Sequence, residues 1–234
     1  YERKVETGAS IYKALKNLLH TKGLATGVGD EGGFAPENIS VTKSLEMLAL
    51  AVKDAGFELG KDVFLGTDVA AGSFYNESEN IYELDDENLS LSPVEFYDFY
   101  GDLLQKYPLI YIEDPLFESD FNSWHDFYIR FNEKTMVVGD DLVVTNAKIL
   151  NTALEKETIN AVIVKPNQIG SLSETFDFVS KAQEHGLVTT VSHRSGDTAE
   201  DTFISDLAVG IGADFVKFGA TARGERVVKY NRLL

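Results

Sequence analysis

Six short apolar runs in this chain each end on a residue with acid–base or ligand chemistry. These end residues are Asp68, Glu113, Asp140, Lys165, His193 and Lys217. The runs occupy residues 63–68, 109–113, 136–140, 161–165, 187–193 and 214–217. Continuous apolar runs of this length are typical of strands buried on both faces of a parallel sheet. From Asp140 onward the end residues recur about every 25 positions, enough for a strand, a helix and two short loops. The pattern therefore predicts repeated βα units.

Repeated βα units favour an α/β fold of the (β/α)8 barrel type. In such a barrel the strands are parallel, so their carboxyl ends converge on one rim, where the active sites of this fold lie. Three carboxylates, two lysines and a histidine would meet there. The chain has 234 residues, of which 44% are hydrophobic, and no composition break marks a linker. We therefore expect a single domain over residues 1–234, with one core.

The charge balance excludes several classes of partner. The net charge is −17, with 38 acidic against 21 basic residues, so nucleic acid and anionic membrane surfaces would be repelled. There is no cysteine, which excludes disulfides and thiolate metal sites. No apolar stretch is long enough to cross a bilayer and no signal-like segment opens the chain, so we predict no membrane partner and a cytoplasmic location. An anionic substrate would need a local cationic pocket, which a bound metal can supply.

Helix signals are clear at two places. Ser92, Pro93 and Glu95 predict the start of one helix, and Ser171 with Glu174 forms a capping box for another. The second helix is expected to end at Gly186. Residues 76–90 are polar, and we interpret them as a surface excursion between a strand and its helix.

Five local motifs stand in a fixed order along the chain. They are Gly29-Asp30-Glu31-Gly32-Gly33, Ile112-Glu113-Asp114-Pro115, Gly139-Asp140-Asp141-Leu142, Lys165-Pro166-Asn167-Gln168-Ile169-Gly170 and Ser192-His193-Arg194-Ser195-Gly196. Together they resemble the enolase family over the whole chain. The resemblance implies the C-terminal barrel domain of that family, with strand order ββαα(βα)6. It also implies that the first two strands and a smaller N-terminal domain precede Tyr1, so that the chain is a truncated domain.

The acids at three of the run ends suit a hard divalent cation. Asp68, Glu113 and Asp140 would form an all-oxygen cluster, and Mg²⁺ prefers oxygen ligands and retains sites for water and substrate. The alternative is that each acid only caps the helix after its strand. The resemblance implies Mg²⁺ as cofactor, with these three as its ligands and with Glu113 and Asp140 also facing the substrate. Asp141 adjoins Asp140, and the choice between the two stays open.

Lys165 and Glu31 are the candidate proton-transfer groups. Burial at a strand end, together with metal charge, would lower the pKa of a lysine toward the range where the neutral amine acts as a base. The alternative is a lysine that neutralises the acids as a buried ion pair. Glu31 stands among glycines, a context that suits either close approach to a ligand or a plain turn. The resemblance implies that Lys165 is the catalytic base and that Glu31 protonates the departing hydroxyl.

The His193-Arg194-Ser195 segment offers an imidazole, a planar guanidinium and a hydroxyl, which suit phosphate or carboxylate recognition. The resemblance implies that His193 is a catalytic residue, that Arg194 and Ser195 bind phosphate, and that Lys217 holds the substrate carboxylate. The segment 196–201 carries one residue more than the family pattern.

The activity implied is the Mg²⁺-dependent reversible dehydration of 2-phosphoglycerate to phosphoenolpyruvate in glycolysis and gluconeogenesis, a lyase reaction. The full-length protein would then be a homodimer with a small-molecule substrate. Two alternatives stay open. One is another dehydratase or racemase of the same superfamily. The other is a catalytically incompetent fragment that acts as a binding module.

Overall fold

The computed structural model describes residues 1–234. The chain divides into two compact units. The central unit is Phe64–Thr190, and the terminal unit consists of Tyr1–Val63 together with Val191–Leu234. Both units contain helices and strands, which confirms the α/β class predicted from the sequence.

Parallel strands form the core of the central unit. β1 (Leu65–Asp68), β5 (Leu109–Glu113), β6 (Met136–Gly139) and β7 (Ala161–Val164) lie side by side in this order, each parallel to the next. All four residues of β7 are fully buried, as expected for a strand covered on both faces. β8 (Val188–Ser192) begins in this unit, where the amide of Val188 donates to the carbonyl of Asn160, and ends in the terminal unit.

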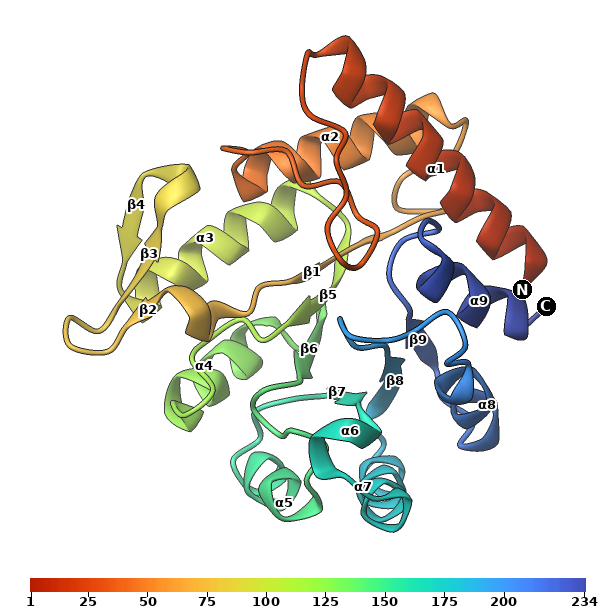
Figure 1. The fold of residues 1–234 in the computed structure, drawn as a ribbon. Coiled ribbons are helices and arrows are strands. Elements are labelled where there is room, and N and C mark those ends of the chain that lie inside the picture. The colour runs from red at the N-terminus through yellow and green to blue at the C-terminus, as the bar shows by residue number, and fades with distance from the viewer. The chain divides into compact units, whose positions relative to one another are not determined.

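Helices alternate with these strands. They are α3 (Pro93–Lys106), α4 (Phe121–Phe131), α5 (Ala147–Glu155), α6 (Pro166–Ile169) and α7 (Leu172–Glu184). In Figure 1, α4, α5 and α7 lie along one side of β5, β6 and β7. The Ser92–Glu95 capping box starts α3 as predicted, and the side chain of Ser171 accepts a hydrogen bond from the amide of Glu174 at the start of α7. Local capping chemistry in the sequence therefore fixes where these helices begin.

The polar segment before α3 is more ordered than its composition predicts. It forms a three-stranded antiparallel sheet of β2 (Tyr75–Asn76), β3 (Ile81–Leu84) and β4 (Leu89–Leu91), with short 3₁₀ turns η1 (Ala71–Phe74) and η2 (Asp85–Glu87). Figure 1 shows this sheet beside α3. Tyr82 of β3 is fully buried against Phe96, with ring centroids 4.7 Å apart. One buried aromatic side chain thus anchors the excursion to α3.

The terminal unit joins segments from both ends of the chain. It contains α1 (Glu2–Thr21), α2 (Val41–Asp54), α8 (Phe203–Gly210), β9 (Phe215–Lys217) and α9 (Gly224–Arg232). Helices α1 and α2 pack together, and α8 packs on α9. The amide of His193, just after β8, donates to the carbonyl of Lys217 at 2.9 Å. Strands are thus present at all six predicted apolar runs. No helix of the chain combines the length and the apolar character needed to cross a bilayer.

Candidate functional site

The central unit carries acidic side chains at the carboxyl ends of neighbouring strands. Asp68 ends β1 and Glu113 ends β5, and the two residues are direct partners in the parallel register. Asp140 follows Gly139, the last residue of the adjacent β6. Asp68 is exposed, whereas Glu113 and Asp140 are buried. The predicted acids therefore stand at the carboxyl ends of three neighbouring strands, although the acidic oxygens that lie within 4.8 Å of one another are those of Asp114, Asp140 and Asp141.

A tyrosine holds Glu113 in place. The hydroxyl of Tyr111 donates a hydrogen bond of 2.7 Å to Glu113 Oε2. Burial first, and then the negative charge of Glu113, raise the pKa of Tyr111 far above its ordinary value of 10.0, so the phenol remains a donor at neutral pH. The sequence contained a signal for this contact, because residues two apart on a strand point to the same face.

Lys165 contacts Asp140 directly. Its ammonium donates to Asp140 Oδ2, while Gln168 Nε2 donates to Asp140 Oδ1 at 2.9 Å. Thr145 links the two partners, since its hydroxyl donates to Gln168 Oε1 and accepts from the amide of Lys165, both at 2.9 Å. The side chain of Lys165 is 19% exposed. The ion pair considered as an alternative is thus present, and it places the amine beside a carboxylate of the acidic edge.

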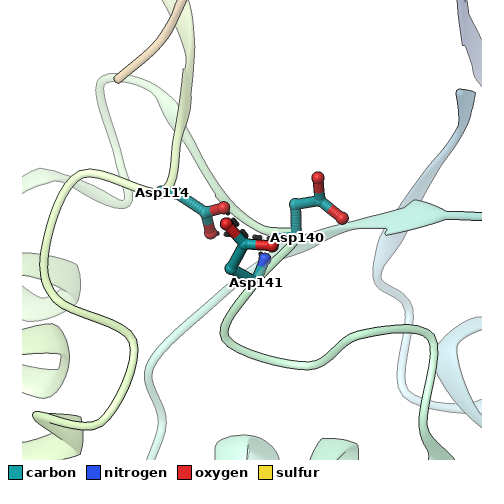
Figure 2. A group of neighbouring side chains, drawn as sticks. All are labelled: Asp114, Asp140 and Asp141. Atoms are coloured by element: carbon teal, nitrogen blue, oxygen red, sulfur yellow. Dashed lines mark hydrogen bonds between the residues drawn. The ribbon is translucent and has the colours of Figure 1, made fainter. Parts of the chain in front are cut away.

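Asp114 binds the backbone of the next loop. Its two carboxylate oxygens accept hydrogen bonds from the amides of Asp140, at 3.0 Å, and Asp141, at 2.9 Å (Figure 2). The side chain is buried, and burial raises the pKa of Asp114 to about 8. Asp114 has a positive φ of 42°, which only a well-supported backbone tolerates in a non-glycine residue. These bonds hold the backbone of residues 140 and 141 in place, and so they fix the position from which the Asp140 side chain projects.

The same three aspartates form a second possible cation site. Oxygens of Asp114, Asp140 and Asp141 lie within 4.8 Å of one another. In Figure 2 the carboxylates of Asp114 and Asp141 lie close together, while the carboxylate of Asp140 points away from them. Burial first, and then the charge of Asp140, raise the pKa of Asp141. Asp140 belongs to this set and to the predicted one, and all donors in both are oxygens, which fits a hard divalent cation.

In the terminal unit Glu31 faces His193. His193 Nε2 lies 3.4 Å from Glu31 Oε2, and the histidine side chain is 2% exposed whereas that of Glu31 is 52% exposed. The hydrogen bond from His193, reinforced by the positive charges of Lys217 and Arg226, lowers the pKa of Glu31 to about 2. Glu31 is therefore a carboxylate at neutral pH, held against a buried imidazole.

The family model for the enolase C-terminal TIM barrel domain matches residues 1–234. The chain belongs to this family. The match confirms the resemblance and the fold class inferred from the five motifs, and it assigns the chain to an enzyme family of the lyase type. Domains of the enolase superfamily generally depend on a metal, and the aspartate cluster of this enolase domain could hold an ion.

Each unit of the enolase domain gathers its own predicted residues. The central unit contains Asp68, Glu113, Asp140 and Lys165, and the terminal unit contains Glu31, His193, Arg194, Ser195 and Lys217. Arg194 and Ser195 are exposed. Lys217 is half-buried and its charge acts on Glu31.

Sequence reasoning missed three charged residues of the enolase domain. Arg226 and Lys229 on α9 are fully buried, and Asp197 lies 3.7 Å from Arg226 Nη1 and 3.1 Å from Lys229 Nζ. Charged residues on a short polar helix are ordinarily on the surface, so no sequence pattern predicts that these two are buried. Asp197 lies in the segment that is expected to carry one residue more than the family pattern. It also accepts a hydrogen bond of 3.1 Å from the amide of Arg194.

Proposed function

We propose that this enolase domain catalyses the reversible dehydration of 2-phosphoglycerate to phosphoenolpyruvate and water. The observation that carries the proposal is the contact of Lys165 with Asp140 at the acidic edge of the parallel strands. It brings a candidate base beside a candidate metal ligand, as proton abstraction next to a metal-bound carboxylate requires.

Asp68, Glu113 and Asp140 would hold Mg²⁺. We favour this set over the one with Asp114, because both oxygens of Asp114 already accept backbone amides. Bound Mg²⁺ would supply positive charge to stabilise the enediolate form of the substrate carboxylate. Lys165 and a divalent cation would compete for the oxygens of Asp140, so a bound cation would weaken the contact between Lys165 and Asp140.

Two proton transfers complete the reaction. Lys165 takes the proton from C2 of the substrate. Glu31 then donates a proton to the C3 hydroxyl, the C3–O bond breaks, and water leaves. In the free domain Glu31 is ionised, because its pKa is about 2. A phosphorylated and carboxylated substrate bound by Arg194, Ser195 and Lys217 brings negative charge close to Glu31, which raises its pKa toward the range needed for an acid.

A second enzymatic candidate is a superfamily dehydratase or racemase that acts on an acid without phosphate. Arg194 offers the planar donors that match phosphate, next to the hydroxyl of Ser195, and this favours the phosphorylated substrate.

A substrate panel on the full-length protein that contains this domain tests the proposal. We expect Mg²⁺-dependent turnover of 2-phosphoglycerate, no turnover of glycerate or of unphosphorylated acid sugars, and loss of activity in Lys165→Ala. Comparable rates on an unphosphorylated acid would favour the other superfamily activities. A folded, Mg²⁺-binding protein that is inactive on every substrate would favour the binding-module alternative.

A further inference from the structure

Arg226 is a buried charge whose every N–H group has a partner in the terminal unit. The guanidinium has five N–H donors and no acceptor. Nε and Nη2 donate to the carbonyl of Asp30 at 3.3 and 3.2 Å. Nη1 donates to the carbonyl of Arg194 at 2.8 Å, and Nη2 donates to that of Ser195 at 3.1 Å. The fifth donor, on Nη1, meets His193 Nδ1.

These bonds tie together two loops that carry candidate site residues. One loop holds Glu31, directly after Asp30, and the other holds the His193-Arg194-Ser195 segment. Arg226 itself is fully buried, so it is not placed to touch a substrate. The planar guanidinium suits this role, because its rigid set of N–H donors fixes the positions of several carbonyl acceptors at once.

The contact with His193 also decides where the imidazole carries its proton. A guanidinium can only donate and does not deprotonate in proteins, so His193 Nδ1 must accept. The proton of the neutral ring is then on Nε2, the nitrogen that faces Glu31 at 3.4 Å. A protonated Nδ1 would set two donors against each other in a buried place, which is costly.

We propose that Arg226 is a positioning residue that holds His193 as the Nε2–H tautomer directed at Glu31. The catalytic consequence of this arrangement rests on the proposed function, whereas the tautomer does not. The competing explanation is that Arg226 only stabilises the fold as a buried ion paired with Asp197.

Lys229 provides a matched control for that explanation. It lies on the same helix, is equally buried, and shares Asp197 with Arg226. Its ammonium donates to the carbonyl of Glu225 at 2.8 Å, and no contact joins it to His193. A purely structural role predicts the same consequences for the loss of either cation, whereas a positioning role predicts a difference at His193.

The test is long-range ¹H–¹⁵N NMR of the histidine rings in the 234-residue chain at pH 7.5. The chain has 4 histidines, so His193→Gln assigns the signal. We expect the wild type to show His193 with a protonated Nε2 and an unprotonated Nδ1. Arg226→Met, which removes all donors, and Arg226→Lys, which keeps the charge but not the fork, should populate the Nδ1–H tautomer. Lys229→Met should retain the wild-type pattern.

A protonated Nδ1 in the wild type would overturn the proposal whether or not the variants fold. So would an unchanged tautomer in a folded Arg226 variant, or an equal change in Lys229→Met. In the full-length enzyme we expect Arg226→Lys to lower kcat by about 10²-fold with little change in KM, as misplacement of a reacting group does. An inactive wild type with the expected tautomer would count against the proposed function alone.

Discussion

The carboxylate of Asp114 accepts a hydrogen bond of 3.0 Å from the backbone amide of Asp140. Its second oxygen accepts the amide of Asp141, so one buried side chain fixes two successive peptide units. Asp140 is the residue that both possible cation sites share. The backbone position of Asp140 thus depends on Asp114, which directly follows the neighbouring strand β5, and not only on β6.

Replacement of Asp114 by alanine should therefore damage both stability and metal binding. The two amides lose their acceptors, and an unsatisfied buried amide costs about 1–3 kcal/mol. We expect a lower free energy of unfolding in urea and an Mg²⁺ affinity that falls by about 10- to 100-fold, as with other supporting residues of metal sites. Asp114→Asn, which retains one acceptor oxygen, should be intermediate. Wild-type Mg²⁺ affinity in a folded Asp114→Ala would show that Asp140 needs no such support.

A pair of single substitutions distinguishes the two possible metal sites. If Asp68, Glu113 and Asp140 hold Mg²⁺, Asp68→Asn should weaken binding at least about tenfold, since it removes a ligand charge. Asp141→Asn keeps the backbone amide that binds Asp114 and should leave the affinity unchanged. Titration calorimetry measures both, with Asp140→Ala as the variant that abolishes binding. The reverse result would assign the ion to Asp114, Asp140 and Asp141.

The two proposed proton transfers can be separated by isotope exchange in the full-length protein. Lys165→Ala should abolish both the entry of solvent deuterium at C2 and net dehydration, because a base is needed for each. Glu31→Gln should abolish dehydration and leave exchange measurable. Net turnover should fall at least about 10²-fold in either variant. Lys148→Ala, an exposed lysine of α5, is the control. Equal loss of exchange in Glu31→Gln and Lys165→Ala, with Mg²⁺ affinity intact, would refute the stepwise order.

The depressed pKa of Glu31 predicts a specific dependence of stability on pH. Its folded-state pKa of about 2 lies below the ordinary value of 4.5, so the ionised carboxylate contributes stability above about pH 4.5. That contribution is lost as the pH falls from about 4.5 toward 2. Urea unfolding of Glu31→Gln and wild type should thus differ most at pH 6, differ less at pH 3 and converge near pH 2. Exposed Glu37→Gln is the control. A difference that does not depend on pH would contradict the hydrogen-bond explanation.

Gly219 permits the close approach between its own segment and the Glu31 loop. Its φ is +86°, and an added Cβ would lie 2.6 Å from the carbonyl oxygen of Glu31 and 2.8 Å from Arg226 Cδ. Gly219→Ala should therefore lower the free energy of unfolding by about 1–3 kcal/mol through backbone strain and overpacking. Gly29→Ala is a fair comparison, because nothing lies within 4 Å of its added Cβ. Equal stability of the two variants in thermal denaturation would show that the loop adjusts freely.

The sequence by itself determined the strands and the residues at their carboxyl ends. Apolar runs as continuous as 161–164 are typical of covered strands, and the residue after such a run lies at the edge of the sheet. Capping residues likewise fixed the starts of α3 and α7. These are local properties, set by the order of neighbouring residues. The five motifs added the family, which the match over residues 1–234 confirms.

Only the tertiary structure decided how the charged groups are supported. The bonds of Asp114 to the next loop, and of Arg226 to the carbonyl of Asp30, 196 residues away in the sequence, join segments that no local pattern connects. The polar segment before α3 forms a sheet that is anchored to α3 by the buried contact of Tyr82 with Phe96. Arg226 and Lys229 are buried because the tertiary structure supplies partners for their charges. The carboxylate of Asp197 lies near both cations, and carbonyl groups accept their hydrogen bonds, so the two side chains can leave water.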